Sequence, residues 1–221
     1  MLPDQGVFIV ADGMGGHAAG EVASEMAVQT IARGLAGVVG KSENEATQMM
    51  IRAIIEANSA IFRRTGDEPE KRGMGTTATA MVVNGPRYIL GQVGDSRAYL
   101  LRDHELSQIT KDHSYVQEQV DAGYLTPDQA RTHPYSNVIT RCVGANSDVV
   151  PDVYVGTLQG DDIYVLASDG LTGMLEDNEL LGILNSDSQP AVVVDNMITE
   201  ANRRGGLDNI TVIIVRIDQI G

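Results

Sequence analysis

The sequence has little of several residue types. Only one of its 221 residues is cysteine, Cys142, and aromatic residues make up 4%. A single cysteine excludes an internal disulfide and a cysteine-based metal cluster. The longest apolar runs, such as ITVIIV near the C-terminus, fall far short of the ~20 residues of a membrane span, and the first residues lack the pattern of a signal peptide. These absences predict a soluble, cytoplasmic protein.

Basic residues are also scarce. Sixteen Lys and Arg stand against thirty Asp and Glu, which gives a formal net charge of −14. This charge argues against nucleic acid or an anionic membrane as the main partner. It would also repel a phosphate-bearing substrate, so such a substrate would need cations at its binding site.

The pattern of apolar residues predicts an α+β protein. The 43% hydrophobic content is enough for a core, and no linker divides the chain, so we expect a single domain over residues 1–221. Periodicity predicts amphipathic helices over 20–38 and 44–62, with further helices over 113–132, 177–185 and 189–203. Thr126 and Pro127 are typical of a helix start, as are Ser188 and Pro190.

Short strands occupy most of the remaining chain. They are predicted over 6–11, 150–158, 162–168 and 210–217, and residues 77–110 read as an antiparallel meander with tight turns. Helices in pairs around antiparallel strands favour a central β-sandwich of two antiparallel sheets flanked by pairs of α-helices.

Four aspartates stand where strand-like runs meet turns: Asp12, Asp95, Asp169 and Asp208. Mg²⁺ and Mn²⁺ prefer oxygen ligands, and crowded carboxylates repel one another unless cations neutralise them. Asp before Gly or Ser is also ordinary turn chemistry. The repetition of one setting four times favours a divalent-cation site.

The glycine-rich segment after the first strand allows two interpretations. Residues 13–18 match the dinucleotide fingerprint GxGxxA. Asp12 would then stand beside a pyrophosphate and oppose its binding, and the following strands are antiparallel rather than parallel. We therefore favour a tight turn that directs the Gly13 carbonyl, together with Asp12, toward a metal ion.

Five motifs carry a resemblance to a known family. ADGMGGH with GEVAS, MGTTA (residues 74–78), VGDSRAYL (93–100), SDGLT (168–172) and DNITV (208–212) resemble, in order, the motifs of bacterial metal-dependent Ser/Thr protein phosphatases of the protein phosphatase 2C family. The resemblance implies hydrolysis of phosphoserine and phosphothreonine on proteins at two Mn²⁺ or Mg²⁺ ions, with a third, weaker ion. Partners would be phosphoproteins, substrates of a bacterial Ser/Thr kinase.

The resemblance also assigns roles. Asp12 would bridge the two ions, the Gly13 carbonyl would complete the second, and Asp169 and Asp208 would hold the first. Asp95 would share the third ion with Asp169. A metal-activated water needs no protein nucleophile, in agreement with the absence of Cys-phosphatase, G-x-S-x-G and P-loop motifs.

The other motif residues have less definite roles. His17 is a candidate general acid, and a structural histidine is the alternative. His133 is a candidate substrate contact in a flap, residues 113–137, and a surface histidine is its alternative. Thr76, Ser96 and Asn209 are expected to support the site through hydrogen bonds.

The N-terminus departs from the family pattern. Family members usually have an earlier strand with an Arg that binds phosphate, whereas residues 1–11 contain no Arg and only Asp4 as an acid. The chain thus resembles an N-terminally shortened member. We expect an unpaired sheet edge open to self-association and metal binding that survives better than turnover. The alternative function is a catalytically impaired phosphoprotein-binding or regulatory module.

Overall fold

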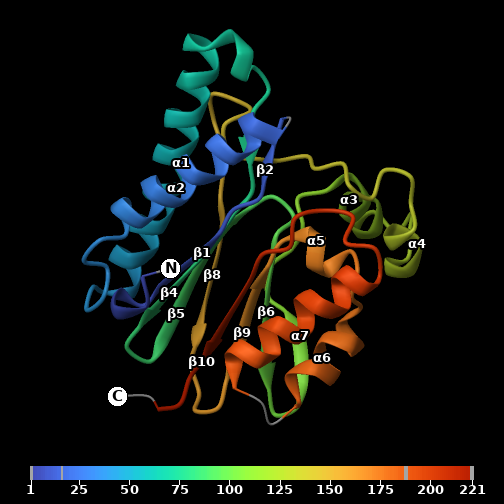
Figure 1. Cartoon of the computed structure of the whole chain (residues 1–221). Helices are drawn as coiled ribbons and strands as arrows, with labels where there is room; N and C mark the ends of the chain where they lie inside the picture. The colour runs from blue at the N-terminus through green and yellow to red at the C-terminus, as the bar shows by residue number, and fades with distance from the viewer. Residues whose placement is uncertain (1, 16, 187–188, 220–221) are drawn as a thin grey trace.

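The fold consists of two stacked antiparallel sheets between helical layers (Figure 1). The computed structural model describes residues 2–15, 17–186 and 189–219. One sheet has the order β1-β4-β5-β8 and the other β10-β9-β6-β7, while β2 and β3 form a small ribbon. The strands are β1 (Val7–Val10), β2 (Gly13–Met14), β3 (Gly75–Thr76), β4 (Ala78–Asn84), β5 (Arg87–Val93), β6 (Arg97–Arg102), β7 (Glu105–Gln108), β8 (Asp152–Thr157), β9 (Ile163–Ala167) and β10 (Val212–Arg216).

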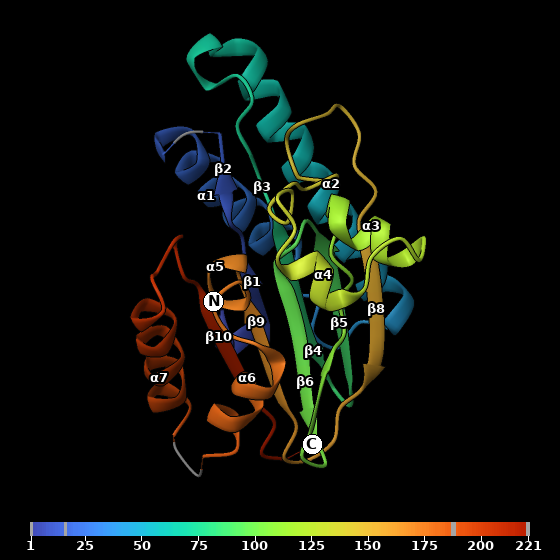
Figure 2. The ribbon, with the colours of Figure 1, turned by 90° about the vertical axis from the view of Figure 1, so that its right-hand side faces the viewer.

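Helices cover the outer face of each sheet. The helices are α1 (His17–Gly34), α2 (Glu43–Asp67), α3 (Tyr115–Asp121), α4 (Pro127–Arg131), α5 (Asp169–Thr172), α6 (Asp177–Leu184) and α7 (Pro190–Arg203), with 3-10 turns η1 (Pro3–Gln5) and η2 (Pro69–Lys71). The pair α1 and α2 lies on one side, and α6 and α7 lie on the other (Figures 1 and 2). The predicted sandwich flanked by helix pairs is confirmed.

Alternating side chains on the strands create three apolar layers. In β4, Ala80 and Val82 pack beneath α1 and α2, whereas Met81 lies between the sheets with Leu90 and Leu166. A third cluster lies under α6 and α7. Because successive side chains of a strand point to opposite faces, each central strand contributes to two layers. Packing in these layers holds the strands in place, and the residues of the candidate site follow or precede the ends of those strands.

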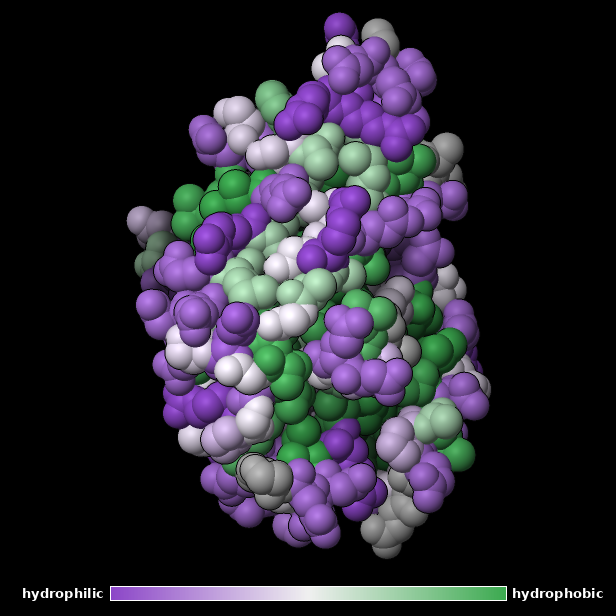
Figure 3. All heavy atoms as spheres, turned by 90° about the vertical axis from the view of Figure 1, so that its left-hand side faces the viewer, coloured by the Kyte–Doolittle hydropathy of each residue, from purple (hydrophilic) through white to green (hydrophobic). Residues whose placement is uncertain are grey.

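Local signals explain how α2 is placed. Ser42 and Glu45 form a capping box, in which the Ser42 hydroxyl accepts from the Glu45 N–H at 3.3 Å. Opposite the helix, a Cβ on Gly91 would come within 2.6 Å of Met50 Cγ, so glycine in β5 allows close packing. The far end of α2 projects beyond the sheets, where Figure 3 shows mainly hydrophilic residues.

The predicted meander is wrong in one respect. Strands β4 and β5 belong to one sheet, and β6 and β7 belong to the other. The chain changes sheets at residues 94–96, because Gly94, at φ +106, adopts a left-handed conformation that breaks the strand. Asp95 therefore lies in the crossover between the two sheets.

The predicted helical segment 113–132 is helical, but it is not continuous. It is two short helices, α3 and α4, because Gly123 adopts φ +75 after α3. Thr126 caps α4 with Pro127 as its first residue, as predicted. Pro190 likewise begins α7, while the predicted start signal at Ser188 lies outside the described residues.

The first sheet has an edge at β1. In the part of the chain that the structure describes, β4 is the one strand that pairs with β1, and Leu2 adds a single antiparallel bridge to Val7. Self-association through this edge stays a prediction, which sedimentation velocity over a range of protein concentrations can test. No helix among the described residues has the length and apolar character needed to span a bilayer.

Candidate metal centre

Both sheets contribute aspartates to the candidate site. In the first sheet, Asp12 follows β1 and Asp95 follows β5; in the second, Asp169 follows β9 as the first residue of α5, and Asp208 precedes β10. These strand ends share one end of the sandwich (Figure 1). We call these four residues the aspartate cluster.

The carboxyl groups of the aspartate cluster interact. Burial raises the pKa of Asp12 to about 8, helped by a hydrogen bond with Asp169 and by the charges of Asp169, Asp208 and Asp95. Burial, followed by the charges of Asp169 and Asp112, raises the pKa of Asp95 to about 7. Repulsion of this kind is what a bound cation would relieve.

The donor set fits a hard divalent cation. All four side chains offer carboxylate oxygens, and no cysteine lies in the cluster, so Mg²⁺ or Mn²⁺ suits it better than a soft metal. Across the described residues, no three His, Cys, Asp or Glu side chains form a ready ligand group for one ion. Apart from burial, the groups that raise the pKa of Asp12 are nevertheless the carboxyls of Asp169, Asp208 and Asp95.

Threonines fix the backbone of Asp12. The Asp12 N–H donates to Thr77 Oγ1 at 2.9 Å, and the Asp12 carbonyl accepts from the Thr77 N–H at 2.8 Å and from Thr76 Oγ1 at 2.9 Å. Ser96 Oγ lies 2.7 Å from Thr77 Oγ1, which ties the Asp95 crossover to the same network. Thr76 and Ser96 therefore lie where support for the site was expected.

A second network joins the strands that carry Asp169 and Asp208. Ser168 Oγ donates to the Asn209 carbonyl at 3.1 Å and accepts from the Thr211 N–H at 3.0 Å. A Cβ on Gly170 would stand 2.3 Å from the Asn209 carbonyl oxygen, so only glycine permits this approach. Asn209 takes part through its backbone, and its N–H donates to Asp208 Oδ1 at 2.8 Å.

The glycine-rich segment forms a strand pair rather than a dinucleotide loop. Gly13 pairs with Thr76 in the β2–β3 ribbon, and both large sheets are antiparallel, so the dinucleotide interpretation is wrong. A Cβ on Gly13 would lie 2.0 Å from the Gly20 carbonyl oxygen, which explains the glycine. Use of the Gly13 carbonyl as a ligand stays a prediction. His17 begins α1, but its side chain lies outside the described residues.

His133 lies in an aromatic cluster on the flap. Its ring centroid is 5.9 Å from that of Tyr115 and 5.6 Å from that of Tyr135. His133 Nδ1 accepts from the Tyr135 N–H at 3.1 Å. The Tyr115 N–H donates to the Val138 carbonyl at 2.8 Å, which holds the two ends of the flap together.

Sequence reasoning missed Asp112 and His113 as parts of this region. Asp112 receives a bidentate ion pair from Arg97, with Nε–Oδ1 at 3.0 Å and Nη2–Oδ2 at 2.7 Å. His113 is buried and contacts the residue before Asp95. The available signal was the run Lys-Asp-His-Ser, in which Ser114 caps α3 and leaves the two preceding residues facing inward.

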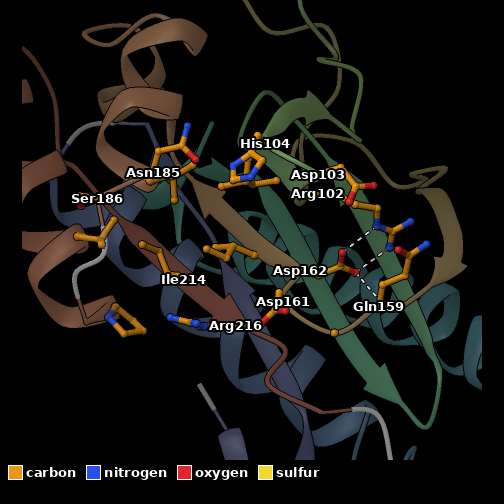
Figure 4. Close-up of a pocket in the computed structure, with 16 residues that line it drawn as sticks. Arg102, Asp103, His104, Gln159, Asp161, Asp162, Asn185, Ser186, Ile214 and Arg216 are labelled. Atoms are coloured by element: carbon orange, nitrogen blue, oxygen red, sulfur yellow. Dashed lines mark hydrogen bonds and ion pairs between the residues drawn. The ribbon is translucent and has the colours of Figure 1, made fainter.

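A separate cavity of about 440 Å³ lies at the opposite end of the sandwich (Figure 4). Two of the polar residues that line it bond to each other: Arg102 donates to the buried Asp162 through Nε and Nη2, at 2.8 and 2.7 Å. Among the described residues, the three non-glycine residues with left-handed backbone line this cavity: Asp103, His104 and Asp161. None of the aspartate cluster contributes to it.

Comparisons with known proteins agree with the motif resemblance. Residues 2–198 match the family described as protein phosphatase 2C. The Serine/threonine phosphatase stp of Listeria monocytogenes is 40% identical over 97% of this chain and 86% of its own length. The Mycobacterium tuberculosis serine/threonine phosphatase PstP/Ppp superposes with a TM-score of 0.90 at 39% identity, over 96% of this chain and 88% of that structure.

One further structure bears on the metal. The catalytic domain of PstP, solved in complex with two manganese ions, has a TM-score of 0.87 and 38% identity, over 96% of this chain and 88% of that one. With its helix-flanked sandwich, its aspartate cluster and these relatives, the chain belongs to the protein phosphatase 2C family.

Proposed function

We propose that this protein hydrolyses phosphoserine and phosphothreonine on proteins at a dinuclear Mn²⁺ or Mg²⁺ centre. The observation that carries the proposal is the placement of four aspartates at one end of the sandwich, where burial and then the charges of neighbouring carboxyls raise the pKa of Asp12 and Asp95. When bound, two such ions lower the pKa of a water toward ~7 and stabilise charge on the phosphoryl group. The relatives are named phosphatases, which gives no support to a catalytically impaired module.

The residues divide the work between binding and positioning. Asp12 would bridge the two ions, the Gly13 carbonyl would serve the second, and Asp169 and Asp208 would serve the first. Asp95 and Asp169 would hold a third, weaker ion. The threonine and Ser168 networks keep these ligands in place, because they fix the backbone on both sides of the sandwich.

The test is turnover of p-nitrophenyl phosphate and of a phosphothreonine peptide with Mn²⁺. We expect activity in the wild type that EDTA abolishes, that added Mn²⁺ restores, and that Asp169→Ala removes. Binding of Mn²⁺ and phosphopeptide without any turnover would contradict the proposal and favour the regulatory module. Activity that resists EDTA would contradict a metal mechanism altogether.

We further propose that residues 113–137 form a flap that adjusts to protein substrates. Tyr124 and Tyr135 are 77% and 58% exposed, so the flap offers apolar surface to a bound peptide. Replacing residues 116–137 with a short glycine-serine linker between the paired positions 115 and 138 should lower kcat/KM for the phosphopeptide at least ~10-fold. Turnover of p-nitrophenyl phosphate should stay within ~3-fold. Equal losses on both substrates would count against a flap.

The physiological partners remain part of this proposal. Named relatives such as the protein phosphatase PhpP of Streptococcus pneumoniae share 38% identity with this chain. We infer that phosphoproteins made by a bacterial Ser/Thr kinase are the substrates.

A further inference from the structure

His113 makes a reciprocal contact with the loop that carries Asp95. The Gly94 N–H donates to His113 Nδ1 at 3.0 Å, and the His113 N–H donates to the Gly94 carbonyl at 3.0 Å. Both groups are buried, so neither bond is readily replaced by water. His113 thus holds both polar groups of the residue immediately before Asp95.

Gly94 is also held by Gln92, whose Nε2 donates to the Gly94 carbonyl at 3.0 Å, whereas the Gly94 N–H donates to His113 Nδ1. Gly94 has no side chain, and its φ of +106 excludes most other residues. A Cβ there would also lie 2.6 Å from Thr77 Cγ2. Since the strand ends at Val93, the direction in which Asp95 leaves the sheet depends on how the Gly94 peptide is held.

The other side of the His113 ring is fixed as well. Since Nδ1 accepts a hydrogen bond, the proton lies on Nε2, which donates to Asp152 Oδ2 at 3.1 Å. Asp152 Oδ1 also accepts from Arg141 Nη1 at 2.8 Å. Burial lowers the pKa of His113, in agreement with a neutral ring. Asp152 and Arg141 therefore fix the ring orientation that Gly94 requires.

His113 is also the first residue of the flap, residues 113–137. Its carbonyl accepts from the Thr140 N–H at 2.8 Å, and the next residue, Ser114, caps α3. On the far side of Asp95, Arg97 is held by Asp112. The adjacent residues Asp112 and His113 thus bond to the crossover loop on both sides of Asp95, at Arg97 and at Gly94.

We propose that His113 is a positioning residue, which orients Asp95 for the third, weaker metal ion through the amide of Gly94. The inference rests on the proposed function, because Asp95 has a metal role only there. His113 itself would contact neither ion nor substrate, because its two ring nitrogens bond to Gly94 and Asp152. Loss of a group that orients a metal ligand typically costs 10–100-fold in affinity.

Two substitutions separate the two ring nitrogens. In His113→Asn the amide oxygen falls near the place of Nδ1 and can still accept from Gly94. In His113→Gln the amide nitrogen falls near the place of Nε2 and can still donate to Asp152, but the acceptor for Gly94 is lost. The two variants differ by one methylene group, and each keeps one of the two contacts of the ring.

The direct readout is Mn²⁺ binding measured by isothermal titration calorimetry, with amide exchange at Gly94 followed by NMR. We expect His113→Gln to weaken the weakest Mn²⁺ site at least ~10-fold and to speed Gly94 exchange. His113→Asn should stay within ~3-fold of the wild type on both measurements. In an Asp95→Asn background, His113→Gln should add no further loss, because both changes act on one site.

The alternatives have distinct outcomes. Equal losses in both variants, with equally lowered melting temperatures, would show a merely structural histidine and overturn the inference. An additive loss in the Asp95→Asn background would overturn it as well. A wild type that binds no Mn²⁺ and turns over no phosphoester would instead refute the proposed function.

Discussion

Asp12→Asn should abolish turnover while making the metal-free protein more stable. The substitution removes the carboxylate proposed to bridge the two ions. We expect kcat/KM to fall at least ~10³-fold, equivalent to about 4 kcal/mol of transition-state stabilisation. The amide remains able to hydrogen-bond to Asp169, so the fold should be retained.

The gain in stability follows from the sign of the pKa shift. Burial and the neighbouring carboxyls raise the pKa of Asp12 from 3.8 to about 8. Between these values the folded state binds more protons than the unfolded state, so the free energy of unfolding falls as pH rises from about 4 to about 8. Asparagine has no such charge, so the substitution removes this loss.

The size of the gain can be bounded. One pKa unit corresponds to about 1.4 kcal/mol, and solvent screening of this partly exposed group reduces the effect. We expect a gain on the order of 1–2 kcal/mol at pH 8 in the presence of a chelator. For a domain of this size that is a rise in melting temperature of roughly 2–8 °C.

The measurement is thermal unfolding in EDTA at about pH 5 and at about pH 8, with turnover in Mn²⁺ beside it. The gap in melting temperature between variant and wild type should widen at the higher pH. Asp161→Asn is the matched control, because this exposed aspartate lies in the cavity at the other end of the sandwich and should change neither quantity. A lower melting temperature for Asp12→Asn at both pH values would contradict our account of the cluster.

Arg102→Met should strongly lower the free energy of unfolding of the protein without changing its turnover of phosphoester. Asp162 is 1% exposed and accepts from Arg102 Nε and Nη2, from the Gln159 N–H and from Tyr164 Oη. Removal of Arg102 leaves this buried charge with two donors. Breaking a buried pair in this way costs about 3–5 kcal/mol, or a fall in melting temperature of roughly 6–20 °C.

The pH dependence gives a second check on this pair. Burial opposes ionisation of Asp162, but the hydrogen bonds from Arg102, the Gln159 N–H and Tyr164, together with the charge of Arg102, outweigh it and lower the pKa of Asp162 below 3.8. The pair therefore stabilises the fold above about pH 4 and is lost as pH falls below that value. The difference in stability between Arg102→Met and the wild type should therefore become smaller below about pH 4.

Arg216→Met is the control for the loss of an arginine. Arg216 Nε lies 3.4 Å from Asp218 Oδ1, and both side chains are well exposed, so we expect a change of less than about 1 kcal/mol. At 20 °C, well below both midpoints, turnover per folded molecule in Arg102→Met should match the wild type within ~2-fold. A change as small as that of Arg216→Met would show that the pair contributes nothing.

Much of the fold was predictable because local patterns coincide with packing. The strand runs around Asp12 and Asp169 are apolar and end in glycine turns, and both strands lie in the sheets as predicted. Thr126 and Pro127 start a helix for a purely local reason, since capping involves only neighbouring residues. Five separated motifs also indicate the family from the sequence alone.

The errors concern information that is not local. Residues 77–110 look like a meander because nothing in the run specifies which sheet each strand joins. The pairing of β6 with β9 decides it. His113 was missed for the same reason, because its partners Gly94 and Asp152 are distant in sequence. Tertiary contacts of this kind leave no period or spacing in the chain.

The division of the aspartate cluster between the sheets has a mechanical consequence. Asp12 and Asp95 extend from one sheet, and Asp169 and Asp208 extend from the other. An ion shared by Asp12 and Asp169 would therefore cross-link the two sheets. Separating the sheets would then require breaking coordination bonds as well as apolar contacts. The concentration of metal would thereby set how strongly the two sheets resist separation. In the metal-free protein, the sheets would separate first at the end that carries the aspartate cluster.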